Sequence, residues 1–476
     1  MSNIKKIAWN TGVQIAGKSI STIFGVIIIS LMTRYLGSKG FGYYSTANSF
    51  FQIFSLFLDF GIFITMIQML GENKDNIEKE NQITSATITL RILSGLIILG
   101  IVPLIGLFLP YDQPVKIILG ILFIAFFSSS INQIVTGTQQ RHLKMHIVAF
   151  AEIIGRTILL IGVIISIYYQ LSLAIITIFV SLGSLVNLII NYYGAKKYAS
   201  FKWNIDITLW KKIIKKSWPI GISIMFNLLY FKMDTVILSL VKSPTEVGIY
   251  SAAYRILEIL STIPFMLAGI TLPILTNYWI KSKKEEFQKL LNQSYIAMTI
   301  LALPLVVGIL VIGTQGIILI SGTDFILSGS ILKILSVALL AIFFSTISSH
   351  VIVAINKQQT ILKSYIIISI ITIIGYIIFI PPYGIWAAAW LTVFSEVAIA
   401  LITTFYINIQ TKNSFPIKNS LKSLLCASIM GLIIYPFRHL IIIIPISIGI
   451  ISYSFLIIIT KTISPKTFQE IFQLKK

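Results

Sequence analysis

Long apolar runs recur along almost the whole chain, and no other feature of the sequence restricts its fold as strongly. The runs follow one another from Asn10 to Thr460, with short polar breaks between them. A helix needs about 20 apolar residues to cross a lipid bilayer. Only 11% of the 476 residues are charged, whereas about a quarter are charged in soluble domains. The sequence therefore predicts an all-α integral membrane protein and excludes an ordinary soluble one.

The apolar runs predict about 14 transmembrane helices. They cover residues 10–33, 42–69, 86–109, 115–136, 147–169, 171–195, 217–240, 248–278, 290–320, 331–354, 363–380, 385–408, 421–437 and 440–460. A count of 12 or 13 is the alternative, because three divisions rest on short breaks, at residues 169–171, 381–384 and 436–439.

Positive charge gathers on one side of these spans. With the amino terminus placed in the cytoplasm, 26 of the 37 Lys and Arg fall on the cytoplasmic side, six fall outside and five lie within spans. Such a bias is typical of membrane proteins and sets their orientation. We therefore expect both termini in the cytoplasm. The basic residues behind the net charge of +21 therefore border a membrane, and this charge does not indicate a nucleic-acid partner.

The segment at residues 196–216 is the longest one between two spans. It carries apolar residues at helical spacing, interleaved with four lysines. The apolar residues are Ile205, Leu209, Ile213 and Ile214, and the lysines are Lys211, Lys212, Lys215 and Lys216. This pattern predicts an amphipathic helix that lies on the cytoplasmic leaflet. A solvated basic linker is the alternative.

The chain contains an internal repeat. A shift of 206 residues superposes residues 41–48 on residues 247–254, with Gly, Tyr, Ser and Ala identical at four positions. Each copy begins the second span of a six-span block, so the blocks are parallel repeats. We predict an N-terminal lobe at 1–195 with helices 1–6, the linker at 196–216, and a C-terminal lobe at 217–410 with helices 7–12. Helices 13–14 and a basic tail follow at 411–476. Chance similarity of two helix starts is the alternative.

The residues around the repeat resemble two signatures of a known transporter family. Residues 33–44 (TRYLGSKGFGYY) resemble the R-x-L-G-x-x-x-[FY]-G start of the second helix in Wzx-type polysaccharide flippases. Residues 232–235 (KMDT) and 246–255 (EVGIYSAAYR) resemble the second-lobe signature of the same family. That family handles O-antigen and capsule repeat units and belongs to the MATE-like superfamily of multidrug, oligosaccharidyl-lipid and polysaccharide exporters. In layout, the resemblance covers the whole chain.

The resemblance implies a flippase of the bacterial cytoplasmic membrane. Such a protein moves polyprenyl-diphosphate-linked oligosaccharides from the inner to the outer leaflet by alternating access, without a cofactor. Its partners would be the lipid-linked oligosaccharide, membrane lipids, other polysaccharide assembly proteins, and a coupled proton or sodium ion. A drug or cation antiporter and a lipid II flippase of the same superfamily are the alternatives.

A membrane glycan polymerase or ligase is a further alternative, from another class. Such an enzyme would need an extramembrane catalytic loop, but the loops are short and the sequence contains no D-x-D pair. We therefore predict that the chain is not an enzyme and has no catalytic residues. A scaffold without transport is also disfavoured, because it would be expected to avoid charged residues inside its spans.

Ten ionisable residues fall inside the predicted spans and are the candidate site residues. Each costs about 2.5–3.5 kcal/mol at the centre of a membrane helix, so it must find a partner, reach the interface or face water. The resemblance makes the cations candidates for holding a diphosphate in a cavity: they are Lys18, Arg91, Arg156, Lys232 and Arg255. The acids are candidates for ion coupling or for ion pairs: they are Asp59, Glu152, Asp234, Glu258 and Glu396.

Spacing along the helices sorts some of these residues. Glu152 and Arg156 are four apart and Arg255 and Glu258 three apart, which predicts local ion pairs. Lys232 and Asp234 point in different directions, so they need partners elsewhere. Asp59 and Glu396 have no opposite charge within four residues, which favours ion coupling, with a protonated acid satisfied by a neighbouring helix as the alternative. Lys18 and Arg91 lie nearer helix ends and could extend to the interface.

Three other patterns carry no chemistry. Residues 12–19 match the phosphate-binding pattern G-x-x-x-x-G-K-[ST], but they lie within an apolar run that must be helical, so we predict no nucleotide site. His142 and His146 have no Cys or carboxylate beside them, which predicts a solvated loop and no metal. Cys426 is the single cysteine, so an intrachain disulfide is impossible.

Overall fold

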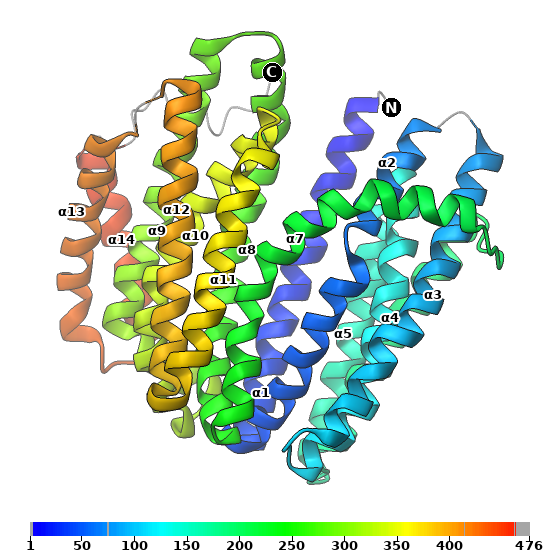
Figure 1. Cartoon of the computed structure of the whole chain (residues 1–476). Coiled ribbons are helices and arrows are strands. Elements are labelled where there is room, and N and C mark those ends of the chain that lie inside the picture. The colour runs from blue at the N-terminus through cyan, green and yellow to red at the C-terminus, as the bar shows by residue number, and fades with distance from the viewer. Residues whose placement is uncertain (1–2, 74–75, 414, 461, 463–476) are drawn as a thin grey trace. The chain divides into compact units, whose positions relative to one another are not determined.

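The computed structural model of the chain describes residues 3–73, 76–413, 415–460 and 462, and this part is built of helices without any strand (Figure 1). The predicted all-α class is therefore confirmed. The α-helices are α1 (Asn3–Asp59), α2 (Ile62–Glu72), α3 (Ile77–Phe108), α4 (Gln113–Arg141), α5 (Met145–Tyr168), α6 (Leu173–Ala195), α7 (Ile207–Val241), α8 (Pro244–Ile280), α9 (Lys284–Ser321), α10 (Ile326–Ala354), α11 (Gln358–Tyr383), α12 (Ile385–Thr411), α13 (Ile417–Ile434) and α14 (Ile443–Ile459). Two short 3-10 helices are η1 (Thr323–Phe325) and η2 (Tyr435–Phe437).

Eleven helical segments in the described part of the chain are long and apolar enough to cross a membrane, and α14 is a shorter apolar helix. The chain is thus a multi-pass membrane protein. One of the 11 segments, residues 12–72, has 61 residues and contains two of the predicted spans. The number of 14 crossings and the cytoplasmic placement of the termini stay predictions.

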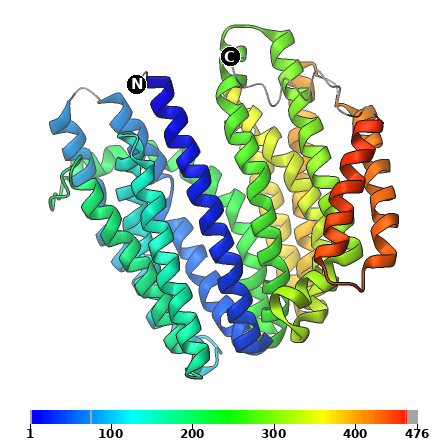
Figure 2. The ribbon, with the colours of Figure 1, turned by 180° about the vertical axis from the view of Figure 1, so that it is seen from behind.

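α1 combines the first predicted span with most of the second. Gly37 interrupts it with φ 63° and ψ −177°, a conformation that glycine adopts without the steric cost of a side chain. The two halves of α1 consequently run in opposite directions (Figures 1 and 2). The element α1 is therefore two helices joined by a kink at Gly37.

The second predicted span, residues 42–69, is not one helix, and this part of the prediction is wrong. α1 ends at Asp59 and α2 begins at Ile62, because Phe60 (φ 36°) and Gly61 (φ 78°) adopt left-handed backbone conformations. The physical reason is close contact with α7. A Cβ atom on Gly61 would lie 2.8 Å from the carbonyl oxygen of Ser217, and one on Gly221 would overlap the carbonyl oxygen of Phe60.

α7 unites the predicted amphipathic helix and the seventh predicted span. It contains Pro219, and Figure 1 shows its first part lying across neighbouring helices before the chain turns to run beside them. Asp206 caps its start, accepting a hydrogen bond from the backbone N–H of Leu209 at 2.9 Å. Along this first part Ile213 is buried, whereas Lys211, Lys212 and Lys215 are exposed. Ile214 is exposed and Ile205 lies before the helix, so the predicted apolar face is present only in part, and its placement on a leaflet stays a prediction.

Hydrogen bonds fasten the segment before α7, and the first turn of α7, to α3. The Asn81 side chain accepts from the backbone N–H of Ser200 at 2.8 Å, and the Thr89 hydroxyl accepts from that of Asn204 at 3.0 Å. The Trp210 indole donates to the carbonyl oxygen of Ala86 at 2.9 Å. These partners lie on one side of α3. The segment therefore packs against α3 and is not a freely solvated linker.

Contacts divide the chain into two compact units, residues 1–248 and 249–476. In the first, Phe51, Leu99, Leu119 and Leu122 are fully buried at the centre of a core formed by α1, α3 and α4. In the second, the predicted final hairpin, α13 and α14, packs on α9 around residues such as Met430. The two six-helix lobes and their boundaries at 195, 217 and 410 stay predictions.

Two glycines of the internal repeat contact each other's helix within the first unit. A Cβ atom on Gly42 would overlap the carbonyl oxygen of Pro244, and one on Gly248 would overlap the carbonyl oxygen of Ser38. Gly42 and Gly248 are equivalent under the 206-residue shift, and so are Ser38 and Pro244. The contact is therefore reciprocal: each copy of the repeat presents the same glycine to the same carbonyl of the other copy.

Candidate functional site

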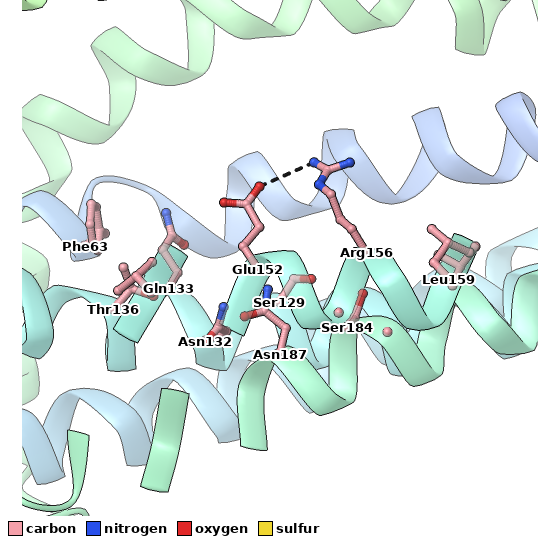
Figure 3. A pocket seen from close by; sticks show the side chains of 14 residues that line it. Phe63, Ser129, Asn132, Gln133, Thr136, Glu152, Arg156, Leu159, Ser184 and Asn187 are labelled. Carbon is pink, nitrogen blue, oxygen red and sulfur yellow. Dashed lines mark hydrogen bonds and ion pairs between the residues drawn. The ribbon is translucent and has the colours of Figure 1, made fainter. Parts of the chain in front are cut away.

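A polar cavity of about 540 Å³ lies inside the first unit, among α4, α5 and α6, with one residue of α2 at its end (Figure 3). Pockets of 300–1,000 Å³ are typical of small-molecule sites. Most of the side chains that line it are polar, although they come from helices of otherwise apolar composition. The lining residues are Phe63, Ser129, Asn132, Gln133, Thr136, Val148, Glu152, Gly155, Arg156, Leu159, Val180, Gly183, Ser184 and Asn187.

Each of three helices contributes one stripe to this cavity. On α4 the lining residues are 129, 132, 133 and 136, on α5 they are 148, 152, 155, 156 and 159, and on α6 they are 180, 183, 184 and 187. The common spacing i, i+3, i+4, i+7 is one face of an α-helix. A Cβ atom on Gly155 would lie 2.6 Å from the carbonyl oxygen of Gly183, and the reverse holds too. The missing side chains thus let α5 and α6 approach closely at this point.

The charged part of the cavity is a cluster around one carboxylate oxygen. Glu152 Oε1 accepts a hydrogen bond from the Ser21 hydroxyl at 2.6 Å, lies 3.6 Å from Lys18 Nζ and 3.5 Å from Arg156 Nη2. Figure 3 shows Glu152 and Arg156 side by side on α5. Ser21 and Lys18 belong to α1, so this oxygen ties α1 to α5. The structure therefore unites three of the predicted site residues and confirms the ion pair that their spacing predicts on α5.

A second pair of predicted residues meets outside this cavity. Arg91 of α3 donates from Nη2 to Asp59 Oδ1 at 2.7 Å. The Arg91 side chain is 1% exposed and that of Asp59 is 20% exposed. Arg91 thus does not extend to an interface, as one alternative suggested, because its partner holds it in the packed interior. Asp59 is the last residue of α1, directly before the break at Phe60 and Gly61.

The remaining candidates lie elsewhere in the described structure and do not line this cavity. Arg255 Nη1 donates to Glu258 Oε2 at 2.7 Å, the ion pair that their spacing predicts on α8. On α7, Asp234 is fully buried and accepts hydrogen bonds from the Thr235 backbone and hydroxyl, and Lys232 is half-buried. Glu396 is buried on α12.

His142, in the turn after α4, does not lie in a solvated loop, so the prediction is wrong for this residue, whereas His146 is exposed at the start of α5. His142 is half-buried, stacks on Tyr198 with ring centroids 5.7 Å apart, and lies 3.7 Å from a carboxylate oxygen of Glu80. Glu80 also pairs with Arg141 at 2.7 Å. Burial lowers the pKa of His142 below its usual value, against the attraction of Glu80. Tertiary packing of α3 on α4 produces this cluster.

The phosphate-binding pattern does not form a loop. Residues 12–19, which match the phosphate-binding pattern, are helical within α1. Among the residues with described positions, no three His, Cys, Asp or Glu side chains are placed to hold a metal ion.

The neutral polar residues of the cavity are not among the predicted site residues, because the prediction rests on charges inside spans. Asn132, Gln133, Ser184 and Asn187 carry no charge, yet they line the same cavity as Glu152. The available signal was a polar stripe at helical spacing inside an apolar run.

Comparisons with known proteins agree on one group. A family model described as polysaccharide biosynthesis protein matches residues 7–279, and the MatE model matches residues 219–381. A probable low-salt glycan biosynthesis flippase, Agl15 of Haloferax volcanii, is 20% identical over 471 residues, covering 96% of this chain and 97% of the relative. The capsular polysaccharide biosynthesis protein CapF of Staphylococcus aureus is 23% identical over 329 residues, covering 68% and 81%.

A solved structure shares the fold. The inward closed conformation of the lipid II flippase MurJ superposes with a TM-score of 0.78 at 19% sequence identity, covering 94% of this chain and 98% of that one. At this identity the similarity establishes the fold alone.

Proposed function

Because the chain belongs to the polysaccharide biosynthesis protein family, we propose that it is a flippase for polyprenyl-diphosphate-linked oligosaccharides. It would turn repeat units from the inner to the outer leaflet of the bacterial cytoplasmic membrane by alternating access, during synthesis of a surface polysaccharide. The relatives named as a flippase and a capsule biosynthesis protein support this class of substrate. Lipids and other polysaccharide assembly proteins would be its partners.

The observation that carries the proposal is the polar cavity among apolar helices. Ionisable and amide groups inside a membrane cost free energy unless they bind to one another or to a polar ligand. Glu152, Arg156, Asn132 and Asn187 line one cavity of about 540 Å³ in a unit whose helices are otherwise apolar. A polar head group can cross a bilayer only if such a surface replaces its water, which is what a flippase must provide.

The predicted site residues take different roles in this proposal. We assign Lys18 and Arg156 to the substrate cavity, because they contact its carboxylate at 3.6 and 3.5 Å. Lys232 and Arg255 are each candidates for diphosphate binding, on the resemblance of their surroundings to the family signature. Arg91 is better suited to a structural role, since its guanidinium is paired with Asp59 in the protein interior. Glu152 and Glu258 are ion-pair partners.

A drug or cation antiporter is the second candidate, favoured by the match of the MatE model to residues 219–381. A lipid II flippase shares the fold. An enzyme has no support in the relatives, whose names describe flippases and biosynthesis proteins.

Removing the Arg156 guanidinium should slow transport by about tenfold or more, because a hydrogen bond to a charged group contributes about 1.5–3 kcal/mol. The measurement is the rate at which a fluorescent polyprenyl-diphosphate disaccharide crosses the leaflets of proteoliposomes that contain wild-type protein or Arg156→Ala. Lys202→Ala, an exposed cation outside the cavity, is the matched control and should transport normally. Absence of protein-dependent crossing, together with gradient-driven efflux of an organic cation, would favour the antiporter.

We further propose that a proton or sodium gradient drives the cycle through Asp59, Asp234 or Glu396. A substrate with equal affinity for the inward and outward states cannot drive a conformational cycle, so a coupled ion must supply the difference. Asp234→Asn, Glu396→Gln and the double variant Asp59→Asn with Arg91→Met, which leaves no buried charge unpaired, are expected to remove gradient dependence at the coupling residue. The measurement is transport with and without an imposed gradient of each ion. Gradient-driven transport retained in all three variants would contradict the proposal.

A further inference from the structure

One carboxylate offsets part of the positive charge at the cavity of the first unit. Glu152 Oε1 is shared by Arg156 Nη2 at 3.5 Å and Lys18 Nζ at 3.6 Å, so two cations and one carboxylate act on any ligand there. A diphosphate that approached Arg156 would also approach this carboxylate, and like charges at such distances repel. The cluster therefore keeps a net charge of only +1, which is too little to neutralise a diphosphate.

The rest of the cavity offers neutral donors and acceptors. The Asn132 Oδ1 atom is buried and makes no hydrogen bond within the described residues. The Asn187 Oδ1 atom accepts from Asn191 Nδ2 at 2.8 Å, which fixes this amide and leaves its NH₂ group to donate elsewhere. Both amide side chains belong to the lining of the same cavity. A buried acceptor without a partner costs about 1–3 kcal/mol, so a ligand that supplies a donor there is favoured.

An aromatic ring lies at one end of the cavity. Phe63 lies there beside Thr136 and Gln133, and Leu159 lies at the opposite end (Figure 3). Phe63 comes from α2, which the break at Phe60 and Gly61 sets apart from α1. A pyranose ring has one face of C–H groups, which packs on an aromatic ring, and a rim of hydroxyl or amide substituents, which bond to polar side chains.

We propose that this cavity binds the sugar part of the lipid-linked substrate, an acylamino sugar, and not its diphosphate. The sugar packs on Phe63, its acylamino N–H donates to Asn132 Oδ1, and its acylamino carbonyl accepts from Asn187. Arg156 contributes its remaining N–H groups to hydroxyls while it stays paired with Glu152. This assignment rests on the proposed flippase function and places glycan selection in the first unit of the chain.

The test compares two lipids on the purified full-length protein: polyprenyl diphosphate that carries one N-acetylglucosamine, and bare polyprenyl diphosphate. Wild type should bind the glycosylated lipid more tightly. Phe63→Ala, Asn132→Ala and Asn187→Ala should each weaken its binding by about tenfold, the effect of one lost hydrogen bond or packing contact, and leave binding of the bare lipid unchanged. Unchanged bare-lipid binding shows that each variant is folded.

Phe57→Ala is the matched control, because Phe57 is 43% exposed on α1 and does not line the cavity. Phe63→Tyr keeps the ring and should bind as wild type does. Equal weakening for both lipids would place the diphosphate in the cavity, and full binding in all three variants would show that no sugar enters it. Either result overturns the inference, as does wild type that binds both lipids equally well. Wild type that binds and flips neither lipid contradicts the proposed function itself.

Discussion

Gly42→Ala is expected to yield little or no stably folded protein. The added methyl group would overlap the carbonyl oxygen of Pro244, which is backbone and cannot move aside by changing a rotamer. Separating the two helices would remove contacts along both, so we expect the free energy of unfolding to fall by more than about 4 kcal/mol, a loss seen for few single substitutions. The measurement is the yield and the thermal unfolding midpoint of detergent-purified protein.

Gly248→Ala should have an effect of similar size, because its methyl group would overlap the carbonyl oxygen of Ser38. Gly120→Ala is the matched control. No atom lies within 4 Å of a Cβ at this position of α4, and alanine is favoured over glycine in a helix by about 0.5–1 kcal/mol. A Gly42→Ala protein as stable as the Gly120→Ala protein would show that a methyl group fits between Gly42 and Pro244, which contradicts the close contact of the two helices.

Asp59→Asn should lower the free energy of unfolding by about 3–5 kcal/mol, because it leaves Arg91 buried without its counter-charge. Arg91 is 1% exposed and bonds to Asp59 at 2.7 Å. Replacing both residues, as Asp59→Asn with Arg91→Met, should recover much of the loss, since no buried charge then remains. Thermal unfolding of the detergent-purified single and double variants provides the measurement.

A surface ion pair gives the comparison for this prediction. Lys283 and Glu286 lie 3.5 Å apart with side chains 51% and 49% exposed. Lys283→Ala should therefore cost at most about 1 kcal/mol. An Asp59→Asn variant that is no less stable than Lys283→Ala would contradict the view that the buried pair holds α1 to α3.

Local features of the fold could be predicted from the sequence because they depend on neighbours along the chain. The apolar runs gave the helical class, and spacing gave the pairs Glu152–Arg156 and Arg255–Glu258. The break at Gly61 could not be predicted, since it arises where Ser217 and Gly221 approach from a distant helix.

The candidate site could be predicted only in part, for the same reason. Arg91 and Asp59 are 32 residues apart, and no local sequence pattern indicates that they form a pair. Charge identified Glu152 and Arg156, but the cavity also depends on Asn132 and Asn187, whose neutral amides give no such signal. Their relation becomes visible only when α4, α5 and α6 are packed together.

The contact between Gly42 and Gly248 has the form of an isologous interface. In a symmetric dimer, the same patch of two identical chains meets across a twofold axis, so that residue i contacts residue j and j contacts i. Gly42 with Pro244, and Gly248 with Ser38, obey this rule inside a single chain. A half-length ancestor could make this crossing with a second copy of itself. Joining the two copies would then convert a bimolecular association into a permanent one and free each half to acquire different polar residues.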